Sequence, residues 1–361
     1  MSDIVYSSFL NATGYSQSSQ DYIHSLLSLH KYTIDLDPFC PPDSKGLCSD
    51  NYDLFKSMIN KKSDARIRFL HCIPDLQSRK SKSSVSVGFG VYEANNPPKH
   101  WINILNTNNA VIVPSEFNKK IFREAGITRP IYHIPHCLDE KCYNKNVIPL
   151  KQNKEFTFLF FGSWKKRKGH LLLIEAWLQE FDRNDNVKLV LKTDKIKIAK
   201  KDIDNLKQKL NINSDNAAPI VFESSILTDA AIPAFLKSFD CLVLPTLGEG
   251  FGLPGLQCMM LGVPIIVTNF SGCKEYANEH TATLIEPEGF ILYNNMDNYP
   301  QFSHKKWVYF SVKQLKEKLR YAYENQDLIK HKADQGLKET QDIFSYRNIA
   351  KKFDNLIQAL V

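Results

Sequence analysis

The chain has 361 residues, 43% of them hydrophobic and 24% charged, which is typical of a soluble globular protein with room for two domains. It lacks an apolar run near the roughly 20 residues that span a bilayer, and its start lacks the basic and apolar segments of a secretory signal. The net charge of +7 is spread over both halves, which argues against a dedicated nucleic-acid-binding protein.

The cysteines indicate a reducing compartment. None of the eight forms a C-x-x-C pair, and Cys72, Cys241 and Cys258 fall in apolar or helical segments. Thiols used in this way behave as small hydrophobic side chains. We therefore expect a cytoplasmic protein without a zinc site, and a metal ligand set is not predicted elsewhere in the sequence.

Short apolar runs along the chain predict strands buried on both faces of parallel sheets. These runs are Ile4–Leu10, Arg66–Ile73, Val85–Val91, Ala110–Pro114, Phe156–Gly162, Val187–Lys192, Ile220–Phe222, Cys241–Pro245 and Pro264–Thr268. Helical spacing separates many of them, most clearly after Lys168, where apolar residues recur every three or four positions. This alternation predicts a doubly wound α/β architecture.

A polar, proline-containing stretch at residues 144–154 predicts a boundary between two Rossmann-like domains, residues 1–150 and 151–343. The last segment, residues 344–361, carries apolar residues on one side and is expected to be a helix. Ligand-facing loops of such domains lie at the carboxyl ends of the strands.

Two features of the first domain follow strands. The polar loop Asn11–Gln20, with Gly14, precedes a helix expected near Asp21–His30 and is typical of a phosphate- or sugar-facing loop. An ordinary strand-to-helix turn is the alternative. His71 lies near the carboxyl end of a strand, where functional groups gather, although a lone histidine at such a position is more often a hydrogen-bonded core residue.

Three other features of this domain have weaker signals. Glu93, just past a strand, and Trp101, on the following helix, are candidate ligand-binding residues, or else a loop acid and a core aromatic residue. The basic segment Arg79–Lys82 is expected to be a solvated loop, with contact to anionic lipid or an anionic acceptor as the alternative.

The second domain contains a basic turn. A strand ends at Gly162, and four basic residues, Lys165 to Lys168, precede the next helix. Arg and Lys stabilise phosphates, so this turn is a candidate site for a diphosphate. Solvated surface charges are the alternative.

The run Leu247–Gly272 combines an acid, a glycine-rich turn and a helix start. Glu249 lies in the turn, Pro254 follows at the start of the helix, and Gly250 and Gly252 leave the backbone accessible to a ligand. The free N–H groups and the positive dipole end of a helix favour a phosphate. A carboxylate beside a phosphate site suggests a ligand with both hydroxyls and phosphates, which a nucleotide-sugar has.

Together, the segments GSWKKRKG, DCLVLP, EGFGLP and LGVPII, with VPSEFNKKIFREAGI and IYHIPHCLD before them, resemble the retaining glycosyltransferases of family 4. This resemblance implies the GT-B fold, in which two Rossmann-like domains face each other across a cleft. It implies transfer of a sugar from a UDP- or GDP-sugar to a hydroxyl of a sugar, glycan or lipid-linked acceptor, in glycan or glycoconjugate biosynthesis. A metal ion or other cofactor is not required, and peripheral contact with the cytoplasmic membrane face stays open.

The resemblance also implies roles for individual residues. Glu249 contacts the hydroxyls of the donor sugar, and Lys168, with Arg167 beside it, neutralises the diphosphate leaving group. The backbone at the helix start meets the donor's phosphate at Gly250, Phe251, Gly252 and Leu253. In the first domain, Gly14 faces the donor and His71 lies near its sugar, while Glu93 and Trp101 are candidates for the acceptor side. The final helix, residues 344–361, is expected to pack back against the first domain.

Two positions depart from the family pattern. The second acid of the family's pair is Gln257 here, so its bond to the ribose hydroxyls lacks charge assistance, a loss of about 1–2 kcal/mol. Ser163 stands where many members carry an arginine. These departures keep two alternatives open: a noncatalytic nucleotide-sugar-binding protein and a GT-B nucleotide-sugar epimerase. The resemblance also implies that the donor base, uracil or guanine, contacts the loop Glu223–Leu227.

Overall fold

The computed structural model describes most of the chain and leaves out five short stretches. The described residues are 2–11, 13–60, 65–78, 85–213 and 216–361. The basic segment predicted to be a solvated loop, Arg79–Lys82, lies outside these residues.

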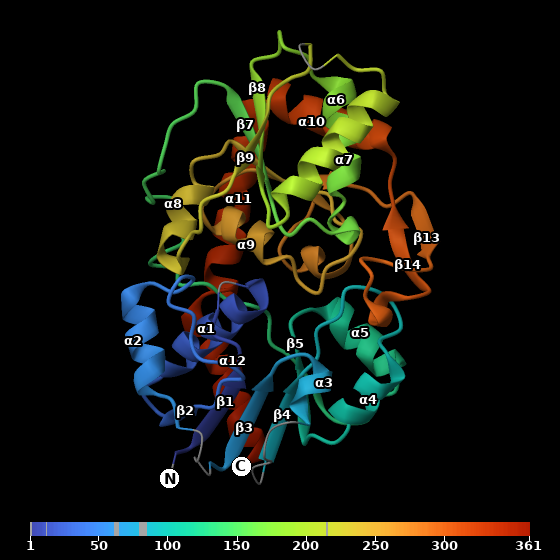
Figure 1. Cartoon of the computed structure of the whole chain (residues 1–361). Coiled ribbons are helices and arrows are strands. Elements are labelled where there is room, and N and C mark those ends of the chain that lie inside the picture. The colour runs from blue at the N-terminus through green and yellow to red at the C-terminus, as the bar shows by residue number, and fades with distance from the viewer. Residues whose placement is uncertain (1, 12, 61–64, 79–84, 214–215) are drawn as a thin grey trace. The chain divides into compact units, whose positions relative to one another are not determined.

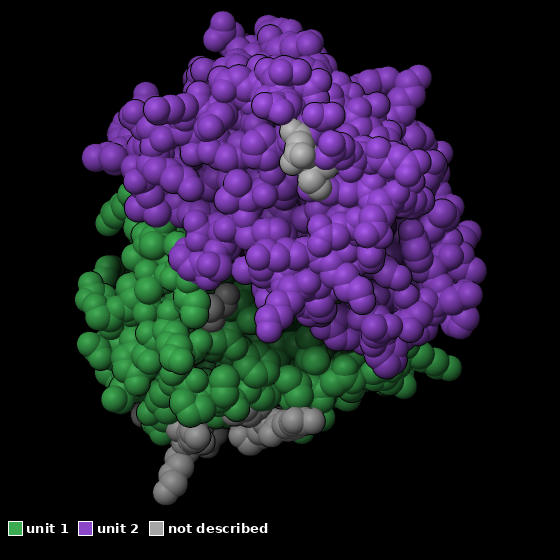
Figure 2. Space-filling model, turned by 45° about the horizontal axis from the view of Figure 1, so that its top comes forward, with its two compact units in different colours: residues 1–142, 226–232, 341–361 green, residues 143–225, 233–340 purple. Residues whose placement is uncertain are grey.

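The chain divides into two units, coloured separately in Figure 2. Unit 1 consists of residues 1–142, 226–232 and 341–361, and unit 2 of residues 143–225 and 233–340. Within the described residues, each unit has a six-stranded sheet in which neighbouring strands are parallel. The predicted α/β fold with two Rossmann-like halves is confirmed.

The sheet of unit 1 has the strand order β2-β1-β3-β4-β5-β6. Its strands are β1 (Ile4–Ser8), β2 (Ile34–Leu36), β3 (Ile67–His71), β4 (Val85–Phe89), β5 (Ala110–Val113) and β6 (Ile131–His133). All residues of β1, β3 and β5 are buried, as their apolar sequences predict. The sequence did not predict β2 and β6, because three residues are too few to show a periodicity.

The helices of unit 1 include the last helix of the chain. They are α1 (Gly14–Leu27), α2 (Ser49–Ser57), α3 (Pro74–Gln77), α4 (Lys99–Leu105), α5 (Glu116–Glu124) and α12 (Tyr346–Leu360). Helices α1 and α12 lie side by side (Figure 1). Ile349, Phe353 and Leu356 of α12 are fully buried in the same apolar cluster as Tyr6 and Phe69 of the sheet. The apolar side of the C-terminal helix therefore completes the core of unit 1.

The start of α1 corrects one prediction. The segment Asn11–Gln20 was expected to be a loop and the helix to begin near Asp21, but α1 begins at Gly14. Thr13 caps the helix by accepting a hydrogen bond from the Ser16 N–H. The small polar residues fit inside the helix because their hydroxyls donate to backbone carbonyls, as Ser18 does to Tyr15 O at 2.8 Å.

The sheet of unit 2 has the order β12-β11-β10-β7-β8-β9. Its strands are β7 (Phe156–Phe161), β8 (Val187–Lys192), β9 (Ile220–Glu223), β10 (Cys241–Leu244), β11 (Ile265–Thr268) and β12 (Thr283–Ile285). Every strand predicted from an apolar run is therefore present in one of the two sheets. The α-helices that follow in sequence are α6 (His170–Glu180), α7 (Ile196–Lys209), α8 (Ile232–Leu236), α9 (Leu253–Met260), α10 (Val312–Glu324) and α11 (Gln326–Ile343).

An antiparallel hairpin stands apart from this sheet and was not predicted. It consists of β13 (Gly289–Tyr293) and β14 (Lys305–Tyr309), with Phe290 opposite Val308. The Val308 N–H donates to Leu247 O at 3.3 Å, which joins the hairpin to the segment after β10. Short 3₁₀ helices occur at Lys166–Lys168 (η1), Asp229–Ala231 (η2), Ser271–Glu275 (η3) and Pro300–Phe302 (η4).

Candidate functional site

The turn after β10 buries a carboxylate at the carboxyl edge of the sheet in unit 2. Glu249 is only 5% exposed. Its backbone is held from both sides by η3: the Glu249 N–H donates to Ser271 Oγ at 2.9 Å, and the Gly272 N–H donates to Glu249 O at 3.0 Å. These two hydrogen bonds therefore fix the backbone position of Glu249.

The basic turn after β7 lies against the same segment. The Leu247 N–H donates to Arg167 O at 2.7 Å, and Thr246 Oγ1 lies 3.0 Å from the same oxygen. Gly169 ends the turn with φ +69°, and a Cβ there would meet Pro245 O at 1.8 Å. Only glycine allows this left-handed turn to approach the end of β10 so closely. The two segments singled out in the sequence thus form one site.

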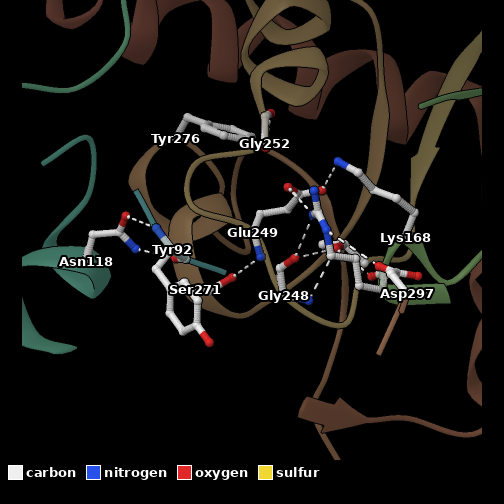
Figure 3. A network of polar contacts seen from close by, with 11 residues as sticks. Tyr92, Asn118, Lys168, Gly248, Glu249, Gly252, Ser271, Tyr276 and Asp297 are labelled. Atoms are coloured by element: carbon white, nitrogen blue, oxygen red, sulfur yellow. Dashed lines mark hydrogen bonds and ion pairs between the residues drawn. The ribbon is translucent and has the colours of Figure 1, made fainter. Parts of the chain in front are cut away.

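The side chains of the two turns form an ionic network (Figure 3). Lys168 Nζ pairs with Glu249 Oε1, and Arg167 Nη1 lies 3.1 Å from Glu249 Oε2. Burial alone would raise the pKa of Glu249, but the charges of Lys168 and Arg167 outweigh it and hold the pKa below its usual value. Glu249 is therefore ionised, with each carboxylate oxygen bound to a cation. The side chains of Arg167 and Lys168 are 11% and 13% exposed, so only a small part of each reaches the surface.

Helix α9 begins beside this network. Its N-cap residue, Gly252, has φ +88°, and a Cβ there would meet Tyr276 Oη at 2.8 Å. Tyr276 Oη donates to Gly252 O at 2.8 Å, which holds the helix start in place (Figure 3). Among the residues that the structure describes, no side chain caps the helix, and its first turn begins with Leu253 and Pro254. Uncapped N–H groups and the positive end of the helix dipole favour an anion at this point.

Gln257, at the position of the family's second acid, is 2% exposed on α9. Its Nε2 donates to Tyr143 Oη at 3.0 Å. The amide nitrogen is therefore engaged within unit 2, and the carbonyl oxygen is the group that could accept a hydrogen bond from a ribose hydroxyl. That role stays a prediction.

Two predicted residues lie in unit 1, at the carboxyl side of neighbouring strands. Gly14 is exposed at the first position of α1, and a Cβ there would meet nothing within 4 Å, so the space over it is open. His71 ends β3, paired with Ser8 of β1, and is fully buried. Its Nδ1 lies 2.8 Å from Tyr6 Oη.

The surroundings of His71 are those of a core residue. Its ring stacks on Phe89 with centroids 4.1 Å apart, and its Nε2 lies 3.4 Å from Ser18 Oγ. Burial, with a smaller effect of His136, lowers the pKa of His71 well below its usual value. The imidazole is therefore neutral. Its role near a donor sugar stays a prediction.

The candidates for the acceptor side differ in exposure. Trp101 is 3% exposed, and its Nε1 donates to Asp75 Oδ2 at 2.7 Å, so it is a core aromatic residue, the alternative that the sequence left open. Glu93 is half-buried beside the buried Tyr92.

Sequence reasoning missed several residues around the network. Ser271 binds the Glu249 backbone, Tyr143 binds Gln257, and Asp297 approaches Arg167 with Oδ2 3.9 Å from Nε. The cluster NNMDN at residues 294–298 is a clear turn signal. A turn signal does not show which other segment the loop contacts, so the sequence could not place Asp297 near Arg167.

The described residues include no group of three or more His, Cys, Asp or Glu that could hold a metal ion. Over the same part of the chain, no helix combines the length and hydrophobicity that a membrane span requires.

The segment that holds the network is similar to known glycosyltransferases. A family model described as "Glycosyl transferases group 1" matches residues 155–292. The serotype-specific mannosyltransferase WbdA of Escherichia coli is 25% identical over 126 residues, which are 34% of this chain. Those residues cover only 15% of WbdA. The basic turn, Glu249 and α9 all fall within the segment that the family model matches.

Solved structures match the whole chain. HepE of Anabaena, solved with UDP and glucose, is 13% identical and has a TM-score of 0.67, with 99% of this chain and 100% of that chain covered. A sucrose-phosphate synthase from Thermosynechococcus elongatus is 15% identical with a TM-score of 0.70, and 99% of each chain is covered. A glycosyltransferase from Rickettsia africae is 14% identical with a TM-score of 0.69, over 99% of this chain and 98% of that one. The fold is therefore GT-B, as predicted.

Proposed function

We propose that this protein is a retaining glycosyltransferase of the family 4 type, which transfers a sugar from a UDP- or GDP-sugar to a hydroxyl of a sugar, glycan or lipid-linked acceptor. One observation carries the proposal: a buried, ionised Glu249 is held by Lys168 and Arg167 beside the start of α9. This arrangement lies within the segment that the group 1 glycosyltransferase model matches. WbdA is a mannosyltransferase by name and HepE was solved with UDP-glucose, which is consistent with a nucleotide-sugar donor.

The basic turn supplies the charge that departure of a nucleoside diphosphate requires. Negative charge grows on the leaving oxygens as the glycosidic bond to the donor breaks. Lys168 and Arg167, with the N–H groups at the start of α9, would stabilise that charge in a preorganised site. The proposal therefore requires no metal ion or other cofactor, because cationic side chains and a helix N-terminus supply the positive charge.

Glu249 would orient the sugar instead of attacking it. Each of its oxygens is already bound to a cation, and this lowers its ability to act as a covalent nucleophile. A carboxylate in this position can still accept hydrogen bonds from sugar hydroxyls. Attack of the acceptor on the face that the leaving group departs from would then retain the anomeric configuration.

The proposal is tested by incubating the protein with a panel of UDP- and GDP-sugars and acceptor mixtures, with mass spectrometry of the products. We expect release of one nucleoside diphosphate together with a glycoside. Tight donor binding without hydrolysis or transfer across the panel would instead identify a noncatalytic nucleotide-sugar-binding protein. Release of free sugar isomers would identify an epimerase. We propose that the reaction takes place in the cytoplasm, where nucleotide-sugars are available.

A further inference from the structure

The connection between β13 and β14 reaches the basic turn of the candidate donor site. Lys165 Nζ donates to Tyr299 Oη at 2.9 Å and lies 4.5 Å from the centre of the Tyr299 ring. Asp297 Oδ2 lies 3.9 Å from Arg167 Nε (Figure 3). A single loop therefore contacts two of the four basic side chains in this turn.

The environment of Asp297 is unusual for a carboxylate. Its side chain is 2% exposed, and its Oδ2 accepts no hydrogen bond from any residue that the structure describes. A buried carboxylate is unfavourable unless a charge or hydrogen bonds compensate it. The guanidinium of Arg167 provides that charge, and it is shared by two carboxylates, because its Nη1 pairs with Glu249 and its Nε with Asp297.

The loop holds Asp297 in this position at a conformational cost. Asp297 and Asn298 have φ of 58° and 59°, in the left-handed region that most side chains avoid. The loop is anchored by Met296, which is fully buried, and by Phe302, which packs against Trp307 with ring centroids 5.2 Å apart. Such strained backbone persists only where its surroundings hold it, and it is concentrated at functional sites.

We infer that Asp297 is a positioning residue for Arg167 and competes with the donor diphosphate for it. The inference rests on the proposed function, because it assumes that the basic turn binds a diphosphate. The carboxylate of Asp297 balances part of the positive charge when the site holds no diphosphate, and it limits the affinity for the nucleoside diphosphate that the reaction releases. A site without this carboxylate binds its product more tightly.

The inference is tested with Asp297→Asn, which preserves the shape of the side chain and tolerates left-handed backbone. UDP and GDP are titrated calorimetrically into the wild-type protein and the variant. We expect binding of the preferred nucleotide to tighten about fivefold or more, since one negative charge is removed next to a phosphate-binding arginine. The matched control is Glu317→Gln, the same charge change at an exposed position on α10, which should leave affinity unchanged.

A double-mutant cycle tests whether the effect passes through Arg167. In an Arg167→Met background, Asp297→Asn should no longer tighten binding. If Asp297→Asn does not fold, Asp297→Gly removes the carboxylate at a position where glycine adopts the same φ without strain. Unchanged or weaker nucleotide binding in a folded variant, or a gain that persists without Arg167, would overturn the inference while leaving the proposed function intact. A wild-type protein that binds neither UDP nor GDP would overturn both.

Discussion

Replacing Lys168 with alanine removes one of the two cations that hold Glu249 and face the proposed diphosphate. Lys168 Nζ pairs with Glu249 Oε1, and the lysine side chain is 13% exposed. A hydrogen bond to a charged group contributes about 1.5–3 kcal/mol, and each 1.4 kcal/mol corresponds to a tenfold change in rate. We therefore expect Lys168→Ala to lower turnover by about 10- to 150-fold.

The assay is release of the nucleoside diphosphate from the preferred donor, measured as kcat and KM with the donor varied. The matched control is Lys166→Ala, because Lys166 lies on the same turn and is exposed. Glu249 keeps Arg167 as a partner in the variant, so we expect a stability loss of no more than about 1–3 kcal/mol, which thermal unfolding would reveal. Turnover within about threefold of the wild type, in a folded variant, would refute the assignment of Lys168 to the leaving group.

Four further substitutions test single positions. Gly252→Ala should destabilise the protein by about 1–3 kcal/mol, as measured by thermal unfolding, because the φ of Gly252 is +88° and the added Cβ would meet Tyr276 Oη. Gly14→Ala should leave the stability unchanged, because a Cβ there meets no atom within 4 Å. If Gly14 faces the donor, this second variant should raise the KM for the donor in steady-state kinetics. Gln257→Glu should tighten nucleotide binding if Gln257 meets the ribose, and titration of UDP and GDP giving equal or weaker binding would assign it another task. Burial raises the pKa of Asp21 to about 7 in the folded state, although hydrogen bonds from Tyr346 and Gln17 lower it in part. The folded protein therefore binds this proton more tightly than the unfolded chain does. As the pH rises from about 4 to about 7, the free energy of unfolding should fall by up to about 4 kcal/mol. Asp21→Asn should remove this loss of stability, measured as the difference in the free energy of urea unfolding between pH 5 and pH 8. An equal difference in the wild type and the variant would show that Asp21 does not cause the pH dependence.

The sequence predicted the parts of the fold that depend on local pattern. The runs at Phe156–Gly162 and Val187–Lys192 are long and apolar enough to form β7 and β8 within a residue of their expected bounds. Strands of three residues, such as β2 and β6, leave no such pattern. The start of α1 was misplaced because serines usually favour turns, and here their hydroxyls are satisfied by the backbone of the helix.

The sequence predicted those parts of the candidate site whose residues lie close together along the chain. Glu249, the glycines around it and the start of α9 lie within a few residues of one another, and parallel strands bring the basic turn to the same edge of the sheet. Asp297 could not be predicted in this way. Its contact with Arg167 spans more than a hundred residues and depends on how a hairpin outside the sheet folds back.

We propose above all that Glu249 and its two cations, Lys168 and Arg167, act in glycosyl transfer from a nucleotide-sugar. The most direct test compares nucleoside diphosphate release from the preferred donor by the wild-type protein and by Glu249→Gln, with glycoside formation followed in the same reaction. We expect the wild-type protein to release the nucleoside diphosphate and form a glycoside, and the folded variant to lose most of this activity while still binding UDP or GDP. Equal release by both proteins, or wild-type binding without any release, would contradict the claim.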